Sequence, residues 1–128
     1  MAIKRKKYFG SCHCKKILFH FIAPTEVKII ECNCSICKPL RFLHLIIPHN
    51  DFKLISGKKY MNNYQFMTKK AIHFFCRHCG IKSFYQPRSH KKAYSINYNS
   101  IEDPPKIKKI INFDGNNFEK NLNSISFI

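Results

Sequence analysis

The amino-acid sequence predicts a single-domain, mainly β fold of curved sheets with metal sites embedded in it. Its 128 residues are enough for one hydrophobic core but too few for two. Hydrophobic residues make up 45% of the chain and aromatic residues 14%, with twelve Phe and six Tyr, which favours a folded chain rich in strands. Seven cysteines stand in three close groups, and this pattern indicates metal or redox chemistry.

Short β-branched and aromatic runs separated by turn residues predict about eight strands. Pro24 separates the first two runs, and Ser56-Gly57 closes the fourth. No long stretch has helical periodicity, which favours a sandwich or a curved sheet. The expected strands cover residues 17–22, 27–31, 40–47, 52–55, 60–67, 71–75, 81–85 and 93–98.

The two ends of the chain differ in composition from its middle. We expect residues 1–9 to form a basic lead, residues 10–120 the folded zinc-binding domain, and residues 121–128 a frayed tail. From Ser100 onward the sequence is typical of loops, with one strand expected near Ile110. No internal repeat or linker divides the chain.

The compartment is expected to be intracellular. The basic start lacks the long apolar stretch of a signal peptide, and the longest apolar runs are interrupted by His20 and His44, so none is expected to span a membrane. An odd number of cysteines argues against a disulfide framework and for a reducing environment. The cytoplasm is the first expectation, with the nucleus as the alternative because of the basic run Lys4–Lys7.

The charge is strongly basic, with 23 Lys and Arg against 7 Asp and Glu and a formal net charge of +16. Such a charge favours acidic partners, including nucleic acid, anionic membranes and small anionic substrates. The alternative to an enzyme is therefore a non-catalytic, zinc-stabilised basic domain that binds nucleic acid or another polyanion, with Tyr60 and Tyr94 available for stacking. The lysine runs are scattered, however, and solvated faces explain most of them.

The strongest local motif is Cys76-Arg77-His78-Cys79-Gly80, a zinc knuckle. Two thiolates three residues apart converge on one ion, and Gly80 allows the backbone to turn with positive φ. The other half of this site must come from the first group, Cys12 and Cys14, or from the second group, Cys32, Cys34 and Cys37. The second group holds three cysteines within six residues and can make three bonds to an ion of its own, so the economical division pairs the knuckle with the first group.

This division assigns different roles to the two sites. Four thiolates fill the coordination sphere of zinc, whereas three leave a position for water, a histidine or a substrate. Chemistry is therefore expected at the three-cysteine site. Two alternatives stay open: a protein histidine fills the fourth position, or Cys34 and Cys37 form a redox pair, which is less favoured because no thioredoxin-like βαβ pattern surrounds them.

Short motifs follow one another in order along nearly the whole chain: Gly10-Ser11-Cys12-His13-Cys14, Cys32-Asn33-Cys34-Ser35-Ile36-Cys37, Phe52–Gly57, His73–Gly80, Phe84–Ser89, Tyr94–Asn97 and Phe113–Glu119. This ordered set resembles the family of glutathione-dependent formaldehyde-activating enzymes and centromere protein V. Two residues depart from the family pattern: Lys15 stands where glycine is usual, and Phe118 where tryptophan is usual.

The resemblance implies a β-tent-like fold and two zinc ions per chain. It also implies a carbon–sulfur lyase, in which glutathione and formaldehyde combine reversibly to S-hydroxymethylglutathione. The implied ligands are Cys12, Cys14, Cys76 and Cys79 for a structural zinc, and Cys32, Cys34 and Cys37 for the second zinc.

For such a reaction, Arg88 is the residue expected to bind a carboxylate of the substrate, in a turn after a predicted strand. The alternative for Arg88 is an exposed turn residue. Tyr85 is expected to wall a pocket if its neighbour Phe84 faces the core. His73 is expected to pack in a strand and His78 to be exposed in the knuckle, and neither is assigned a role in the reaction. A zinc module that has no activity is a further alternative.

Overall fold

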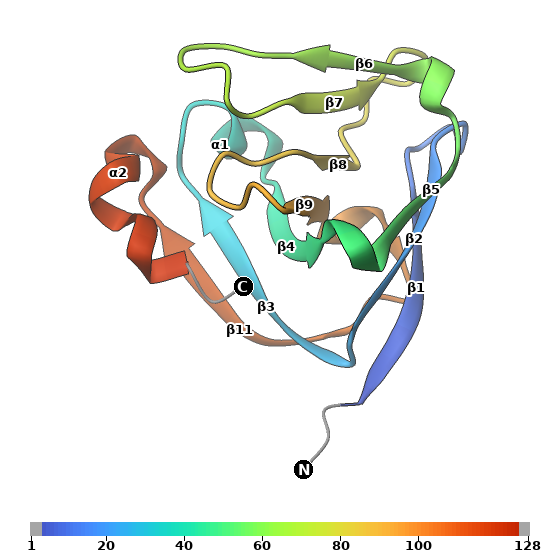
Figure 1. Cartoon of the computed structure of the whole chain (residues 1–128), viewed down its shortest axis with the longest axis horizontal. Helices are drawn as coiled ribbons and strands as arrows, with labels where there is room; N and C mark the ends of the chain where they lie inside the picture. The colour runs from blue at the N-terminus through green and yellow to red at the C-terminus, as the bar shows by residue number, and fades with distance from the viewer. Residues whose placement is uncertain (1–3, 126–128) are drawn as a thin grey trace.

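Two sheets and one hairpin make up the structure, a computed structural model in which residues 4–125 are described (Figure 1). The first sheet has the strand order β10 (Ile101–Glu102), β1 (Arg5–Ser11), β2 (Leu18–Pro24) and β5 (Phe52–Ser56). The second has the order β11 (Lys106–Phe113), β3 (Glu26–Cys32), β4 (Leu43–Pro48), β9 (Ala93–Asn97) and β8 (Phe84–Tyr85). The hairpin pairs β6 (Met61–Tyr64) with β7 (His73–Cys76).

The helices are short connections and not layers of the fold. The four-residue helices are α1 (Cys37–Leu40) and α2 (Phe118–Asn121). The 3-10 turns are η1 (His49–Asp51), η2 (Lys58–Tyr60), η3 (Tyr98–Ser100), η4 (Gly115–Asn117) and η5 (Leu122–Ile125). Within residues 4–125, no helix has the length and apolar character needed to cross a membrane. The expectation of a mainly β fold is confirmed.

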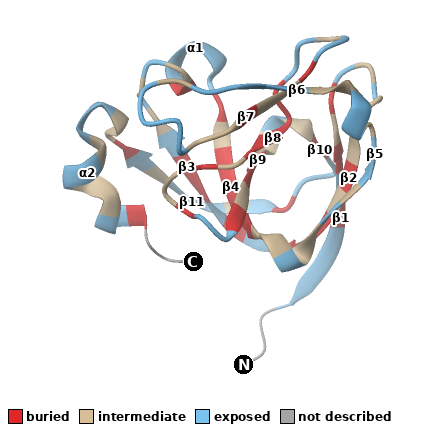
Figure 2. Ribbon diagram, turned by 45° about the horizontal axis from the view of Figure 1, so that its top comes forward, coloured by how far each residue is buried: buried red, intermediate tan, exposed pale blue. Residues whose placement is uncertain are grey.

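The main core lies between the two sheets, where Figure 2 shows most of the buried residues. In β2, Phe19, Phe21 and Ala23 alternate with partly exposed residues and have no exposed surface themselves. This period of two is the pattern of a strand with one buried face. The ring of Phe19 packs 5.2 Å from that of Phe84 on the second sheet.

Strand β4 of the second sheet is covered on both faces, and this feature positions the site. In β4, Leu45 and Ile47 join the main core, whereas Ile46 belongs to a smaller cluster on the opposite face. Because side chains alternate along a strand, His44 shares the face of Ile46. The smaller cluster also contains Phe113 at the end of β11 and the buried Ile125.

The described ends of the chain contain regular structure. Arg5–Ser11 forms β1 and pairs with β2 along its whole length, so the expected basic lead, residues 1–9, overlaps a strand of the first sheet. The strand pattern is weak because only Tyr8 and Gly10 are buried among exposed basic residues. In the expected frayed tail, η5 packs Ile125 into the structure at 3% exposure, while residues 126–128 lie outside the described residues.

The strand expected near Ile110 is present as β11, which is eight residues long and pairs parallel to β3, a strand distant in sequence. The expected strand 40–47 begins only at Leu43, because Cys37–Leu40 forms a helical turn first. Arg41 ends that turn with a φ of 50°.

Candidate metal centre and pocket

Four thiols converge on one point and are called the knuckle cluster here: those of Cys12, Cys14, Cys76 and Cys79. Their sulfur atoms lie within 4.8 Å of one another, and the sulfur of Cys14 is 3.6 Å from that of Cys12 and 3.7 Å from that of Cys76. Four sulfurs held tetrahedrally about 2.3 Å from a zinc ion would stand roughly 3.8 Å apart. Gly80 turns the backbone with a φ of 79°, as the motif predicts.

Backbone amides and the hydrophobic core surround the sulfur atoms of the knuckle cluster. The amide of Ile17 donates to the sulfur of Cys12 at 3.4 Å, and the amides of His78 and Cys79 donate to that of Cys76. Cys12 is 2% exposed and Cys76 is fully buried. Four converging thiolates in this setting are suited to a structural zinc ion.

The second cluster forms where β3 ends and α1 begins. The sulfurs of Cys32, Cys34 and Cys37 lie within 4.8 Å of one another, and among residues 4–125 no histidine nitrogen belongs to this group. The amide of Cys34 donates to the sulfur of Cys32 at 3.5 Å, and the amide of Cys37 to that of Cys34 at 3.4 Å. Amides that point at sulfur favour thiolates, the form that binds metal.

The ionisation of the three thiols and the packing of the turn beside them both bear on metal binding at this cluster. Contacts with Cys32 and Cys34 and then burial raise the pKa of Cys37, whereas contacts with Cys32 and Cys37 lower that of Cys34. The three thiols therefore oppose one another's ionisation unless a cation balances them. A Cβ at Gly115 would stand 2.4 Å from the sulfur of Cys32, so this glycine lets the turn after β11 close over the cluster.

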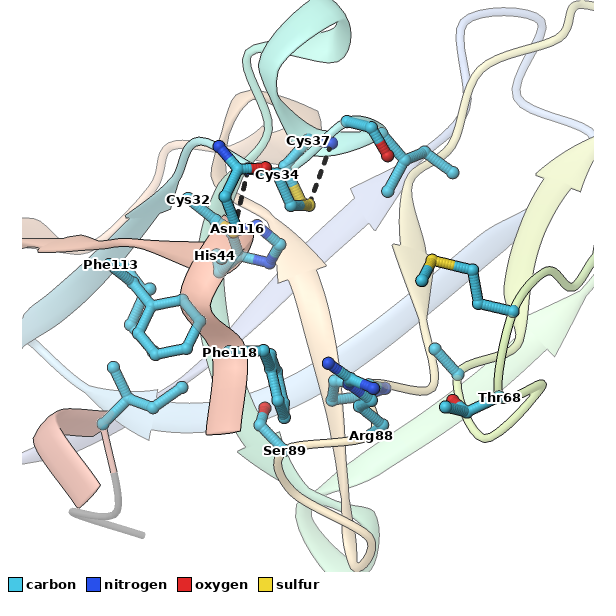
Figure 3. A pocket seen from close by; sticks show the side chains of 18 of the residues that line it. Cys32, Cys34, Cys37, His44, Thr68, Arg88, Ser89, Phe113, Asn116 and Phe118 are labelled. Atoms are coloured by element: carbon cyan, nitrogen blue, oxygen red, sulfur yellow. Dashed lines mark hydrogen bonds between the residues drawn. The ribbon is translucent and has the colours of Figure 1, made fainter. Parts of the chain in front are cut away.

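A cavity of about 610 Å³ opens beside the second cluster (Figure 3). Its wall includes all three sulfur-bearing residues of this cluster but none of the four knuckle cysteines. The wall also includes residues of β3, the turn before α1, β4, the loop between β6 and β7, β7, β8, the turn after β8, the segment from Phe113 to Lys120, and η5. The second cluster therefore faces a cavity large enough for a small-molecule ligand.

Both expected substrate-binding residues line this cavity. Arg88 is 26% exposed at its side chain, its guanidinium lies 3.5 Å from the centre of the Phe118 ring, and its nitrogen stands 3.9 Å from a carboxylate oxygen of Glu119. Tyr85 is 8% exposed and lines the cavity, while its neighbour Phe84 packs in the main core. The departure at Phe118 thus places a phenyl ring beneath Arg88.

Three adjacent strands carry a buried polar group on the cavity side. Ser95 of β9 pairs with Tyr85 of β8, and His44 of β4 lies on the same face. The Nδ1 atom of His44 stands 2.9 Å from the Ser95 hydroxyl and 3.3 Å from the Tyr85 hydroxyl. Burial, and then the charge of Lys82, lower the pKa of His44 to about 3, so the ring is neutral at neutral pH.

Lys82 lies behind this wall and is 7% exposed. Its ammonium is 2.7 Å from Nδ1 of His73 and 3.7 Å from the centre of the Tyr85 ring. Burial lowers the pKa of Lys82 to about 8, and thiolates of Cys37, Cys34 and Cys32 act in the opposite direction. Burial and Lys82 lower the pKa of His73 to about 4. Lys82 is thus a buried cation that interacts electrostatically with the second cluster's thiolates.

His44, Lys82 and Ser95 were not expected at the site from the sequence. The one available signal for His44 was a histidine inside an otherwise apolar run, which was interpreted only as evidence against a membrane span. His73 was expected to pack in a strand; it does so, stacked on Tyr85 with ring centres 4.9 Å apart, but it also lines the cavity. His78 is exposed, as expected.

The chain is similar to known proteins in both sequence and structure. A family model described as glutathione-dependent formaldehyde-activating enzyme matches residues 7–114. The structure is also similar to the crystal structure of a Rhodobacter sphaeroides protein, with a TM-score of 0.67 and 29% sequence identity. That similarity covers 74% of this chain and 88% of the other.

Proposed function

The chain belongs to the glutathione-dependent formaldehyde-activating enzyme family, and we propose that it is a zinc-dependent carbon–sulfur lyase. Its substrate would be the adduct of a glutathione-like thiol and a small aldehyde. The observation that carries this proposal is the difference between the two thiol clusters, since only the three-thiol cluster lines the cavity. A metal with an open position beside a cavity supports chemistry, whereas a filled site supports the fold.

The residues present fit two zinc ions in the proposed enzyme. Cys12, Cys14, Cys76 and Cys79 would hold one, and Cys32, Cys34 and Cys37 the other. When bound at the second cluster, zinc would keep a substrate thiol in its thiolate form at neutral pH.

Arg88 would bind a carboxylate of the thiol substrate. Its ion pair with Glu119 is long, at 3.9 Å, and Glu119 is 82% exposed, so a substrate carboxylate could replace this partner at small cost. Stacking on Phe118 holds the guanidinium plane at the cavity wall. A guanidinium offers two parallel donors to a carboxylate, which fixes the orientation of the substrate.

Apolar residues would limit water around the reacting atoms. Ile46 and Phe113 form one side of the cavity, and Phe66 lies in the loop between β6 and β7 on another side. A thiolate that loses part of its hydration shell is a better nucleophile toward a carbonyl carbon. The chain's own residues thus orient the thiol and shield it.

The test compares two matched substitutions, Cys37→Ser and Cys79→Ser, with the unaltered protein. Zinc per chain is measured by elemental analysis, folding by circular dichroism, and conversion of glutathione and formaldehyde by NMR exchange spectroscopy. We expect two zinc ions in the unaltered protein, one zinc and no activity in a folded Cys37→Ser protein, and loss of the fold in Cys79→Ser. An unaltered protein with two zinc ions but no conversion of thiol and aldehyde would refute the lyase proposal.

A further inference from the structure

The Nε2 atom of His44 is a buried polar atom without a hydrogen-bond partner among the described residues. His44 is 4% exposed, and it lines the cavity beside the second cluster. A buried nitrogen that lacks a partner costs on the order of 1–3 kcal/mol, which a protein tolerates most readily where a ligand supplies the partner. The other nitrogen of the ring is already engaged by hydroxyl groups.

The hydrogen bonds among His44, Ser95 and Tyr85 favour one tautomer of the His44 ring. If Nδ1 accepts from Ser95, the Ser95 oxygen is free to accept from Tyr85, whose hydroxyl also interacts with Ser95, and both hydroxyl protons have acceptors. If Nδ1 carried the proton, it would donate to Ser95, and one hydroxyl proton would lack an acceptor among these groups. Each arrangement leaves one proton without an acceptor, but the second also leaves the lone pair of Nε2 without a donor. The first arrangement therefore leaves fewer unpaired polar groups, and it places a proton on Nε2.

The position of His44 indicates what this N–H binds. Figure 3 draws the His44 ring between the labelled cysteines of the second cluster and Arg88, and all of these residues line the same cavity. A substrate with its sulfur at the cluster and a carboxylate at Arg88 would extend along this wall. Its carbon attached to sulfur, and the oxygen on that carbon, would be the atoms closest to the cluster end of the wall, where His44 lies.

We propose that His44 is a catalytic residue whose Nε2–H binds the oxygen on the carbon attached to the substrate sulfur. This inference rests on the proposed lyase function and extends it to the aldehyde half of the adduct. His44 thereby acts as the donor that stabilises negative charge on this oxygen.

The step balances without a proton from His44. In the direction of synthesis, a lone pair of the thiolate sulfur forms the carbon–sulfur bond, and the carbonyl π pair moves to oxygen. The alkoxide accepts the hydrogen bond from Nε2–H and then takes a proton from water in the open mouth of the cavity, leaving hydroxide. Cleavage reverses both steps, and the electron pair of the carbon–sulfur bond remains on sulfur.

His20 provides a matched control because its Nδ1 also lacks a partner among the described residues. This ring packs edge-to-face against Phe9 on the first sheet and does not line the cavity beside the second cluster. An unpartnered nitrogen alone therefore does not indicate a ligand. For His44, the cavity and the neighbouring thiol cluster supply the second observation.

The first experiment determines the tautomer by two-bond 1H–15N NMR of the zinc-loaded protein, with His44→Phe to assign the signals. We expect the Nε2–H form, and a shift of this nitrogen when glutathione and formaldehyde are added together but not when glutathione is added alone. A proton on Nδ1 would overturn the proposal even in an active enzyme.

The second experiment measures kinetics and zinc content. We expect His44→Phe to keep two zinc ions and to lower kcat/KM by about 100-fold, the effect of losing one oxyanion donor. His44→Gln places an amide donor near the same position and should stay within about 10-fold of the unaltered enzyme, while His20→Phe should match it. Equal losses of glutathione affinity and turnover, or loss of one zinc, would overturn the proposal.

The outcomes also separate this inference from the lyase proposal. An inactive unaltered protein whose His44 signal still shifts with the adduct mixture would refute the lyase reaction but keep the oxygen-binding role. An inactive protein without this shift would refute both. An active protein whose His44→Phe variant is fully active would refute only the role of His44.

Discussion

Replacing Gly115 with alanine adds one methyl group at the point where the turn after β11 meets the second cysteine cluster. The added Cβ would stand 2.4 Å from the sulfur of Cys32 and 2.7 Å from the Cβ of Cys34. Non-bonded heavy atoms rest roughly 3.5–4 Å apart, so the turn and the cluster must separate by about 1 Å. Gly115 does not have a positive φ, so alanine introduces no backbone strain, and the whole effect comes from this overlap.

The expected magnitude follows from the cost of overpacking, about 1–3 kcal/mol. If this cost falls on the metal-bound arrangement of Cys32 and Cys34, zinc affinity at the second cluster drops by about 5- to 150-fold, since about 1.4 kcal/mol corresponds to tenfold. The knuckle cluster does not contact Gly115, so its affinity should not change. The assay is competition with a chelator of known affinity, which resolves the weaker and the tighter zinc in one titration.

Gly80→Ala is the matched control. A Cβ at Gly80 meets no atom within 4 Å, but the φ of 79° makes the substitution strained. We expect this variant to lose about 1–2 kcal/mol of stability and to keep the zinc affinity of the second cluster. If Gly115→Ala bound both zinc ions as tightly as the unaltered protein, the packing argument for the second cluster would be refuted.

Three further predictions follow. Lys15 has a φ of 64° at the position where the family has glycine, so Lys15→Gly should raise the free energy of unfolding by about 0.5–1 kcal/mol in urea denaturation; a decrease would contradict the strain argument. Because burial lowers the folded-state pKa of His44, the unfolded chain binds a proton that the folded chain does not, and stability falls as pH drops below about 6.5. His44→Phe should therefore lose about 2 kcal/mol less than the unaltered protein between pH 7 and pH 5 at saturating zinc, and equal losses would show that His44 titrates normally. Arg88→Lys should raise the KM for the glutathione adduct by about tenfold at similar kcat, because lysine cannot form the bidentate pair; an unchanged KM would remove Arg88 from substrate binding.

The local patterns of the sequence were informative where one segment decides the structure. Strand β2 alternates strictly because one face is buried and the other is partly exposed, so its prediction from residues 17–22 was close. Strand β4 shows no alternation, because both of its faces are covered, and His44 therefore looked like an interruption of an apolar run. Strand β1 was assigned to a basic lead because its exposed residues dominate the composition of that segment.

In the sequence, covalent spacing places the seven cysteines in three close groups, and an economical division between two ions pairs the first group with the third. The structure brings the seven sulfurs into the two clusters that this division predicts. The sequence by itself also determined the mainly β character, because branched and aromatic residues between turn residues leave few alternatives. Only the tertiary structure decided which cluster faces the cavity and which side chains stand around it. His44 meets Ser95 and Tyr85 across separations of 51 and 41 residues, and Gly115 meets Cys32 through the parallel pairing of β11 with β3. Such contacts depend on how the sheet is assembled, and no local pattern records the assembly of strands that are distant in sequence.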